Sequence, residues 1–264
     1  MSLVPPDRNA LVRELRVAGC VFAEEEAELL LTSAAVPPSD PGRLARMLAR
    51  RVAGEPLEQV LGWCEFGGLR VALAPGVFVP RRRTEFLVAQ AVGLACPGAV
   101  TVDLCCGSGA IGLAVHHGLG GVVLHAADVD PVAVECARTN LAPVGAQVYL
   151  GDLFDPLPTA LAGRVELLVA NVPYVPSEAI ALLPREARLH EPAPALDGGT
   201  DGLDVLRRVA AGAAHWLAPA GHLLIEVSVE QAASAGAAFE HGGLAVRLAS
   251  HADDDTVVVI GTPR

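Results

Sequence analysis

The sequence predicts an α/β protein: a mainly parallel sheet covered by helices on both faces, with an antiparallel last strand and a small helical N-terminal domain. Three observations predict this fold. From residue 99 onward, short apolar runs alternate with helix-like segments, which is typical of a parallel sheet. The last two apolar runs have no helical segment between them, so these two strands should pair antiparallel. Residues 7–52 have helical periodicity instead.

The elements follow in chain order. An amphipathic pattern begins with Leu11, Val12, Leu15 and Val17 and ends at Gly19, and acids occupy the first turn of a helix over Ala23–Leu31. Further on, Asp40 is expected to cap a helix over Pro41–Ala53, a hairpin is expected around Gly67-Gly68, and Thr84 is expected to cap a helix over Glu85–Ala95. The expected strands of the sheet are Ala99–Leu104, Val122–Ala127, Gln147–Leu150, Val165–Ala170, Gly221–Val227, Leu244–Leu248 and Thr256–Ile260. The expected helices between them are Ala110–His117, Pro131–Asn140, Asp201–Trp216 and Glu230–Phe239.

The change in character near residue 54 suggests a division of the chain. We expect a helical domain over residues 1–62, a hairpin and linker over 63–83, and the α/β domain over 84–264. A chain of 264 residues is long enough for two unequal domains.

Composition excludes several classes of function. The formal net charge is −11, and no Lys/Arg run is longer than Arg81–Arg83; a nucleic-acid-binding surface needs clustered positive charge, so stable nucleic-acid binding is not expected. The six cysteines form no C-x-x-C pair and the histidines lack metal-ligand spacing, which predicts free thiols, no metal site and a cytoplasmic protein.

No signal peptide or membrane segment is expected. The N-terminus lacks a basic region followed by an apolar core. Residues 104–127 contain no Asp, Glu, Lys or Arg and are long enough to span a bilayer. They also contain six Gly and three His, so a strand, a turn, a helix and a second strand explain them better.

The strongest candidate site follows the apolar run Leu167–Ala170, where the tetrapeptide Asn171-Val172-Pro173-Tyr174 begins. Pro173 cannot donate to a ladder, so the strand ends there. Ligands of open α/β sheets bind beyond the carboxyl ends of the strands. The tetrapeptide therefore brings an amide side chain, backbone carbonyls and an aromatic ring to the expected site.

This set of groups suits a planar NH2-bearing substrate. Such a nitrogen is a poor nucleophile because its lone pair is delocalised. The side-chain oxygen of Asn171 and the carbonyl of Val172 could accept its two N–H groups, and the ring of Tyr174 could stack on its plane. Taken alone, such a tetrapeptide is more often a simple turn after a strand, since turns favour Asn and Pro for backbone reasons.

A second candidate site lies at the first strand-to-helix turn of the sheet. Its members are Asp103, Cys105, Cys106, Gly107, Ser108 and Gly109. The glycines would let a ligand approach the backbone, and the following helix offers free N–H groups. A G-x-G segment alone is also consistent with an ordinary tight turn.

The next two strand ends strengthen the hypothesis of a nucleoside site. Asp128 follows the second strand, where an acid commonly accepts hydrogen bonds from ribose hydroxyls. Capping the following helix is the alternative for Asp128, although Asp130 is better placed for that role. Asp152 and Leu153 follow the third strand and could meet the amino edge and the face of an adenine. No second phosphate-binding loop is visible, so a nucleoside cofactor without phosphates, S-adenosylmethionine, is expected in a Rossmann-like sheet.

At this point the sequence resembles the protein-(glutamine-N5) methyltransferases (HemK/PrmC). Segments similar to the inter-domain signature of that family are Gly54–Glu58, Leu61-Gly62, Glu65-Phe66, Pro75–Val77, Val79–Arg81 and Thr84-Glu85. The loop Asp103-Leu104 with Gly107–Ile111, the acid Asp128, and Asn171 with Pro173-Tyr174 resemble its cofactor loop, ribose acid and catalytic tetrapeptide. Glu191-Pro192, Ala195-Leu196, Gly198-Gly199 and Asp201–Leu203 resemble its late hairpin and following helix.

The resemblance implies a methyltransferase domain and a helical N-terminal domain that helps to engage a protein substrate. It implies methylation of a glutamine side-chain amide, typically in a peptide-chain release factor. Four positions depart from the family pattern. Val172 stands where Pro is usual, Cys105 stands where Gly is usual, and Arg82-Arg83 replace a less basic pair.

Two other functions stay open from the sequence. One is methylation of the adenine amino group in nucleic acid, which uses a similar tetrapeptide. The other is cofactor binding without transfer. Arg81, Glu85 and Glu191 are expected either to line the substrate entrance or to form surface salt bridges.

Overall fold

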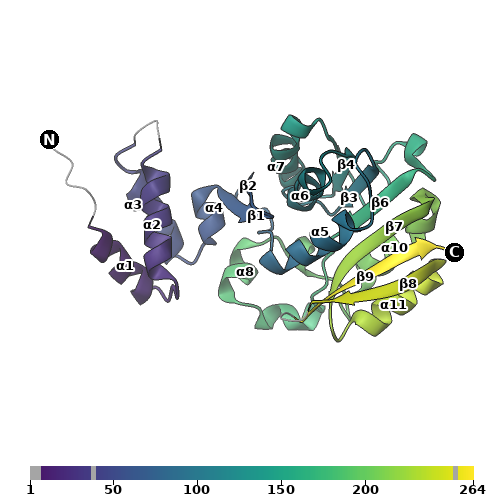
Figure 1. Cartoon of the computed structure of the whole chain (residues 1–264). Helices are drawn as coiled ribbons and strands as arrows, with labels where there is room; N and C mark the ends of the chain where they lie inside the picture. Colours follow the sequence, from purple (N-terminus) through teal and green to yellow (C-terminus); the bar gives the residue numbers. More distant parts are fainter. Residues whose placement is uncertain (1–6, 37–39, 252–254) are drawn as a thin grey trace.

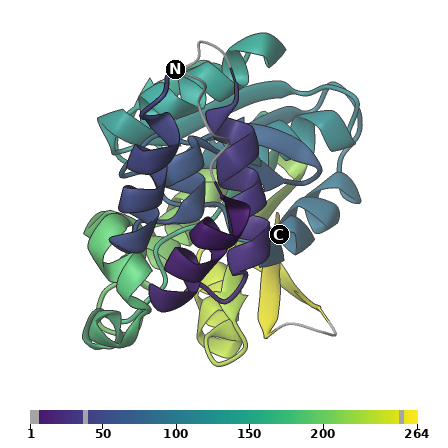
Figure 2. The ribbon, with the colours of Figure 1, turned by 90° about the vertical axis from the view of Figure 1, so that its left-hand side faces the viewer.

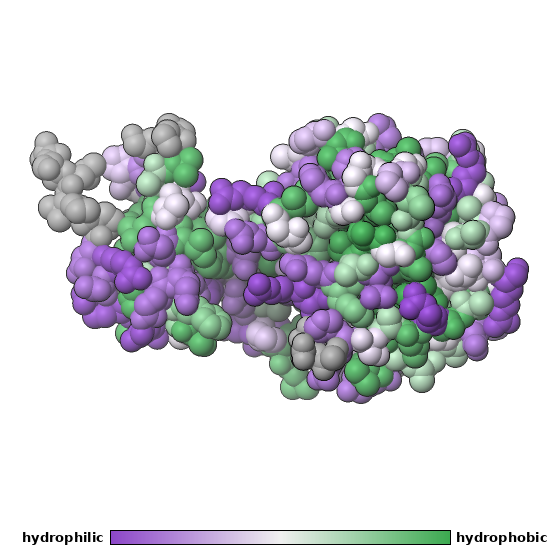
Figure 3. Space-filling model, in the orientation of Figure 1, coloured by the Kyte–Doolittle hydropathy of each residue, from purple (hydrophilic) through white to green (hydrophobic). Residues whose placement is uncertain are grey.

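The computed structural model describes residues 7–36, 40–251 and 255–264. A helical lobe at the N-terminus stands apart from a larger α/β body (Figure 1). Turned by 90°, the lobe lies in front of the body (Figure 2). Hydrophilic side chains cover much of the outer face of the lobe in the view of Figure 3.

Four helices form the lobe: α1 (Arg8–Val17), α2 (Ala23–Ala34), α3 (Arg43–Val52) and the unexpected short α4 (Leu57–Leu61). They enclose an apolar cluster of their own. Its buried members are Leu11, Val12, Leu15, Cys20, Ala23, Ala27, Leu30, Met47, Val60 and Leu61. The carboxylate of Asp40 accepts a hydrogen bond from the backbone N–H of Gly42 at 2.9 Å, immediately before α3 begins.

Polar contacts join the lobe to the body. The guanidinium of Arg51 pairs with Glu26 inside the lobe and also lies 3.5 Å from the carboxylate of Glu186 in α8 (Arg185–His190). The side-chain amide of Gln59 donates to the carbonyl of Val77 at 2.9 Å. These contacts give the lobe a defined position beside the carboxyl edge of the sheet.

The expected hairpin is formed by β1 (Trp63–Phe66) and β2 (Leu69–Ala72), which pair antiparallel. Gly67 and Gly68 both have positive φ, 58° and 73°. A two-residue hairpin turn of this kind requires positive φ at both central residues, which explains the glycine pair.

The body contains a sheet of seven strands in the order β5-β4-β3-β6-β7-β9-β8. Their bounds are β3 (Val100–Leu104), β4 (Val123–Asp128), β5 (Gln147–Leu150), β6 (Val165–Ala170), β7 (Leu217–Ser228), β8 (Leu244–Ser250) and β9 (Thr256–Pro263). Strands β3 to β7 pair parallel, while β9 lies between β7 and β8 and is antiparallel to both. The predicted α/β class and the antiparallel pairing of the last two strands are confirmed.

Helices cover both faces of the sheet. The bounds of these helices are α5 (Glu85–Val92), α6 (Ala110–Gly118), α7 (Pro131–Leu141), α10 (Asp204–Trp216) and α11 (Ala232–His241). In β6, Leu168 and Ala170 belong to the core that holds α10 and α11, whereas Leu167 and Val169 belong to the core that holds α5, α6 and α7. Alternate residues of one strand are therefore buried on opposite faces, which explains its unbroken apolar run.

The segment between β6 and α10 differs from the expected hairpin. It forms three short helices instead, η4 (Ser177–Leu182), α8 and α9 (Ala193–Leu196). A proline immediately precedes each of them, at positions 176, 184 and 192. Because proline removes a ladder donor and suits the start of a helix, repeated prolines here favour helical turns over paired strands.

Several helix bounds also differ from expectation. Helix α3 begins at Arg43 rather than Pro41, with Gly42 and not Asp40 at its N-cap position, and α11 begins at Ala232 rather than Glu230. Val17, expected on the apolar face of the first helix, is exposed.

Helix α10 begins at Asp204 rather than Asp201, because the backbone N–H of Asp204 donates to the carbonyl of Gly198 and closes a turn before it. Thr84 ends the short helix η1 (Arg82–Thr84) and makes no capping hydrogen bond, and α5 ends at Val92 rather than Ala95. The remaining short helices are η2 (Ala142–Val144) and η3 (Thr159–Leu161).

The stretch 104–127 is divided among the end of β3, a loop, α6 and most of β4. In the part of the chain that the structure describes, no helix is both long enough and apolar enough to cross a bilayer.

We expect Leu168→Ala to lower the free energy of unfolding by about 2–5 kcal/mol, because its fully buried side chain would leave a cavity under α10. The matched control is Leu182→Ala: Leu182 is 85% exposed, and its truncation should change the stability by no more than about 0.5 kcal/mol. Urea unfolding of both variants measures the difference. Equal losses would contradict the assignment of Leu168 to the core.

Candidate active site

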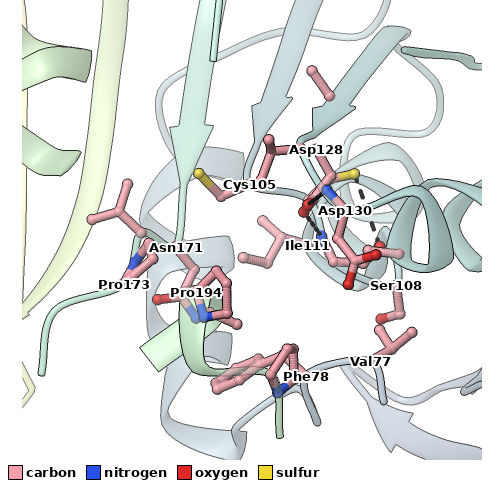
Figure 4. Close-up of a pocket in the computed structure, with 18 of the residues that line it drawn as sticks. Val77, Phe78, Cys105, Ser108, Ile111, Asp128, Asp130, Asn171, Pro173 and Pro194 are labelled. Carbon is pink, nitrogen blue, oxygen red and sulfur yellow. Dashed lines mark hydrogen bonds between the residues drawn. The ribbon is translucent and has the colours of Figure 1, made fainter. Parts of the chain in front are cut away.

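A cavity of about 590 Å³ opens at the carboxyl ends of β3, β4, β5 and β6. Figure 4 shows Cys105, Asp128 and Asp130 on one side, Phe78 opposite them, and Asn171 between. The predicted site residues that line it are Cys105, Cys106, Gly107, Ser108, Asp128, Asp152, Leu153, Asn171, Val172, Pro173 and Tyr174. The ends of four strands therefore bring nearly all of the predicted residues to one place.

The loop after β3 approaches the cavity through its backbone. Gly107 has a φ of 55°, and a Cβ added there would meet nothing within 4 Å. A ligand can therefore approach the peptide plane closely. The backbone N–H of Cys106 donates to the carbonyl of Ala127 at 3.1 Å, which ties the loop to β4.

Cys105 has a φ of 53°, which lies in the left-handed region of backbone conformation that favours glycine. A non-glycine residue there carries a strain on the order of 1 kcal/mol. Its side chain packs against the core that holds α10 and α11. Burial raises the pKa of the Cys105 thiol well above its ordinary value, so the thiol stays neutral.

Two predicted residues support the wall of the cavity but do not line it. The carboxylate of Asp103 is fully buried: one oxygen accepts from the backbone N–H of Gly112 at 2.8 Å, and the other has no hydrogen-bond partner within the described ranges. Burial raises the pKa of Asp103 to about 7. Gly109 begins α6 with a φ of 79°, and a Cβ there would lie 3.0 Å from Leu141 of α7. Both residues hold the loop from behind, so their role is indirect.

Asp128 faces the cavity and also fixes the loop opposite it. One carboxylate oxygen accepts from the backbone N–H of Gly107 at 2.8 Å and the other from that of Asp130 at 2.9 Å. Burial nevertheless raises the pKa of Asp128. Asp130, as expected, caps α7 by accepting from Val132 at 2.8 Å. Asp128 is thus free of the capping role, and its remaining lone pairs can accept hydroxyl donors.

The end of β5 contributes a polar and an apolar group. Asp152 pairs with the guanidinium of Arg208 in α10 at 2.7 Å, and both residues line the cavity. Leu153 lines it beside them with a φ of 49°. Arg208 was not predicted, because a charged residue on a helix usually faces solvent and its sequence position carries no other signal.

Asn171 carries an unusual feature for a buried amide. Its Oδ1 atom is buried and has no hydrogen-bond partner among the residues that the structure describes. The carbonyl of Val172, which lines the same cavity, also accepts no hydrogen bond from the described part of the chain. An unpaired buried acceptor costs about 1–3 kcal/mol, so the arrangement favours a ligand that donates N–H groups here.

The backbone after Asn171 is held from outside. The carbonyl of Tyr174 accepts from the side-chain amide of Gln231 at 2.8 Å. Val175 pairs with the segment before α10: it donates to the carbonyl of Leu196 at 3.0 Å and accepts from Gly198 at 2.9 Å. A Cβ on Gly202 would lie 2.1 Å from the Tyr174 carbonyl. Only glycine fits at this crossing.

Several lining residues were not singled out as site residues from sequence. They are Phe66, Val77, Phe78, Pro80, Thr84, Ala110, Ile111, Val129, Pro131, Ala133, Pro192, Pro194, Ala195 and Val205. All but Thr84 are apolar; half come from the linker and from the segment before α10, and most of the others come from α6, α7 and α10 and the loop before α7. They give the cavity its apolar walls, and apolar side chains of this kind do not by themselves indicate a site in the sequence.

The three candidates for the entrance behave differently. Arg81 lines the cavity, and one of its nitrogens lies 2.6 Å from both carboxylate oxygens of Glu191, which is 6% exposed. Burial raises the pKa of Glu191, against the opposing effect of Arg81. Glu85 accepts from the backbone N–H of Gly67 and supports the hairpin. Among the described residues, no group of three or more His, Cys, Asp or Glu side chains could hold a metal ion.

The chain was compared with proteins of known family. Residues 69–187 match the family model "Methyltransferase small domain". A release factor glutamine methyltransferase from Gloeobacter violaceus is 42% identical over 196 residues, which cover 72% of this chain and 68% of the relative. One from Mycolicibacterium smegmatis is 37% identical over 249 residues, covering 89% and 88%.

One further relative and one solved structure are also similar to the chain. A 4-amino-L-phenylalanine/4-methylamino-L-phenylalanine methyltransferase from Streptomyces pristinaespiralis is 34% identical over 244 residues, covering 89% of this chain and 80% of the relative. The crystal structure of a methyltransferase from Pyrococcus furiosus has a TM-score of 0.56 at 15% identity, covering 83% of this chain and 98% of that one. The second likeness concerns the fold alone.

The raised pKa of Asp103 predicts a pH effect on stability. Its pKa is 3.8 when unperturbed and about 7 in the folded protein. The folded state therefore keeps the proton longer, and the stability due to this group is lost as the pH rises from about 4 to about 7. Asp103→Asn cannot ionise. We expect its stability relative to the unmodified protein to increase across that range.

Urea unfolding of both proteins at a series of pH values measures this effect. A difference that stays constant from about pH 4 to about pH 7 would show that the buried carboxyl does not titrate as proposed.

We expect Gly202→Ala to destabilise the protein by about 1–3 kcal/mol more than Gly145→Ala. Both glycines have positive φ, 79° and 71°, so both substitutions carry backbone strain. Only at position 202 would the new Cβ collide with the Tyr174 carbonyl and Gln231, since the space around position 145 is open. Free energies of unfolding compare them, and equal losses would contradict the crossing described here.

Proposed function

The chain belongs to the release factor glutamine methyltransferase family, and from this premise we propose that it methylates the side-chain amide nitrogen of a glutamine in a peptide-chain release factor, with S-adenosylmethionine as the methyl donor. The observation that carries the proposal is the unpaired Oδ1 atom of Asn171. It lies in the same cavity as Gly107 and Asp128. An acceptor for N–H groups therefore stands beside a site suited to a nucleoside.

The cavity residues fit S-adenosylmethionine. The cavity volume of about 590 Å³ suits a ligand of the size of S-adenosylmethionine. Asp128 would hold ribose hydroxyls, Leu153 with Asp152 would hold the adenine, and the open space over Gly107 would admit the remainder. When bound, S-adenosylmethionine supplies a methyl group attached to a positively charged sulfur, which is electrophilic and leaves behind a neutral thioether.

The residues after β6 would orient the glutamine amide. Asn171 Oδ1 and the Val172 carbonyl would each accept one N–H group, which fixes the plane of the amide and raises electron density on its nitrogen. Both acceptors gain strength as the nitrogen becomes cationic. Holding two reacting groups in the correct geometry can lower a barrier by roughly 7–11 kcal/mol. After the transfer, the methylated nitrogen can lose its extra proton to solvent, so no dedicated base is required.

We further propose a division of labour along the chain. Residues 84–264 form the catalytic domain, residues 63–83 link the two parts, and residues 1–62 engage the protein substrate. The separate apolar cluster of the N-terminal lobe and its contacts with α8 support this division. The lobe thus contacts the segment before α10, which also contributes Pro192 and Pro194 to the cavity wall, and we propose that the protein substrate approaches there.

The experiment follows labelled methyl groups from S-adenosylmethionine into purified candidates. Label on a release-factor glutamine supports the proposal. Label on nucleic acid, label on a small aromatic amine such as 4-aminophenylalanine, or cofactor binding without any transfer would each overturn it.

We expect Asn171→Ala to lower turnover on the release factor by a factor of about 10²–10³, the effect of removing one aligned electrostatic group from an active site. Binding of S-adenosylmethionine should change no more than a few-fold, since Asp128 and the Gly107 loop are untouched. Calorimetric titration with the cofactor is the control for an intact site. Full turnover in this variant would remove Asn171 from catalysis.

A further inference from the structure

A second cavity of about 420 Å³ adjoins the first. Four residues line both of them: Phe78, Arg81, Tyr174 and Ala195. The second cavity extends toward the start of α4 in the lobe, where Pro56 and Glu58 line it, and toward the segment before α10, where Leu183 and Glu186 line it. We call the four shared residues the neck, because they separate the two spaces.

Both aromatic residues of the neck are held by an arginine. The guanidinium of Arg81 lies 4.7 Å from the ring centre of Phe78, and that of Arg83 lies 5.7 Å from the ring centre of Tyr174. Both distances are within the range of cation–π attraction. Arg83 also donates a hydrogen bond to the hydroxyl of Tyr174. Each aromatic residue of the neck is therefore paired with an arginine: Phe78 with Arg81 of the neck, and Tyr174 with Arg83, which lines the second cavity only.

Each arginine is in turn anchored by a buried glutamate. Arg81 pairs with Glu191, and Arg83 pairs with Glu226 of β7 at 3.2 Å. Glu226 is 3% exposed, and its second carboxylate oxygen accepts no hydrogen bond among the described residues. Glu226 sits in the middle of the ladder with β9, opposite Val258. A half-exposed arginine on a rigid, buried anchor differs from an ordinary surface pair, which contributes little.

Arg83 thus connects three parts of the chain. It extends from η1, binds the end of β7 through Glu226, and reaches the hydroxyl of Tyr174 after β6. The backbone of Tyr174 is already fixed by Gln231, so the remaining freedom is that of the ring.

We propose that Arg83 is a positioning residue that holds the Tyr174 ring at the neck between the two cavities, and so sets the passage by which the acceptor side chain reaches Asn171. This inference rests on the proposed function for the identity of the acceptor. Arg83 acts through Tyr174 rather than on the reacting atoms. Its charge is compensated by Glu226, so it adds no net positive charge beside a nitrogen that becomes cationic.

A double-mutant cycle tests whether Arg83 acts through Tyr174. We expect Arg83→Met and Tyr174→Phe each to lower kcat about tenfold, with the Kd for S-adenosylmethionine within twofold. The double variant should be no slower than the slower single variant, because both remove the same contact. Arg82→Met is the matched control, since Arg82 is the exposed neighbour, and its kcat should be unchanged. Multiplying single effects, about a hundredfold together, would overturn the proposal.

A second measurement, by NMR, does not depend on enzyme activity. The chain contains two tyrosines, Tyr149 and Tyr174, so an NMR-active carbon label at tyrosine Cζ gives two signals, and Tyr149→Phe assigns them. At neutral pH the Tyr174 signal should move in Arg83→Met and stay in place in Arg82→Met. An unmoved signal in Arg83→Met would overturn the proposal. If Arg83→Met does not fold, Arg83→Lys, which keeps the charge but not the fork, should shift the same signal.

The kinetic and NMR measurements distinguish a failure of the proposed function from a failure of the role proposed for Arg83. If neither the unmodified protein nor any variant transfers methyl groups to a release factor, the proposed function fails. The NMR signal still decides in that case whether Arg83 positions the Tyr174 ring. If transfer occurs and the signal does not move, only the role of Arg83 fails.

Discussion

The site depends on the restraint of residues 171–174, which follow β6 and make no strand pairing of their own. Beyond Ala170 the chain leaves the sheet, and Pro173 has no N–H to donate. The carbonyl of Tyr174 is therefore fixed from outside, by the side-chain amide of Gln231 at 2.8 Å. Gln231 also reaches the carbonyl of Asp201 at 3.2 Å. One amide at the start of α11 thus joins the loop after β6 to the turn before α10. This junction restrains the backbone that follows Asn171.

Buried carboxylates form the second layer of support. Asp128 accepts two backbone N–H groups and so shapes the cofactor loop while facing the cavity. Asp103 lies behind the same loop, where burial raises its pKa to about 7. Glu191 and Glu226 each neutralise one arginine at the neck. Most of these acids are matched by a donor of opposite charge or by backbone N–H groups, which is what makes burial of a carboxylate tolerable. The protein thus keeps a polar site inside apolar walls.

The sequence predicted what depends on local pattern and on topology. Periodicity located every strand of the sheet, and the parallel order places the residues after Leu104, Ala127, Leu150 and Ala170 together. It could not predict contacts between distant side chains, such as Arg208 with Asp152 or Arg83 with Tyr174. It also failed between β6 and α10, where the expected hairpin is three short helices. A proline precedes each helix, and their effect on pairing is visible only when all three are considered together.

Val172 stands where the resembling family usually has proline, and the structure shows what restrains the loop after β6 without a proline there. A proline at 172 would fix its own φ and restrict Asn171 before it. Pro173 still restricts Val172 to extended backbone, so the direction of the Val172 carbonyl is largely retained. The β-branched side chain of Val172 is 2% exposed and packed in the core beneath α10, which restricts it further. The lost restraint therefore falls on Asn171, whose predecessor Ala170 is paired with Ile225 of β7. Strand pairing on one side and a buried valine on the other hold the asparagine in place of the proline ring.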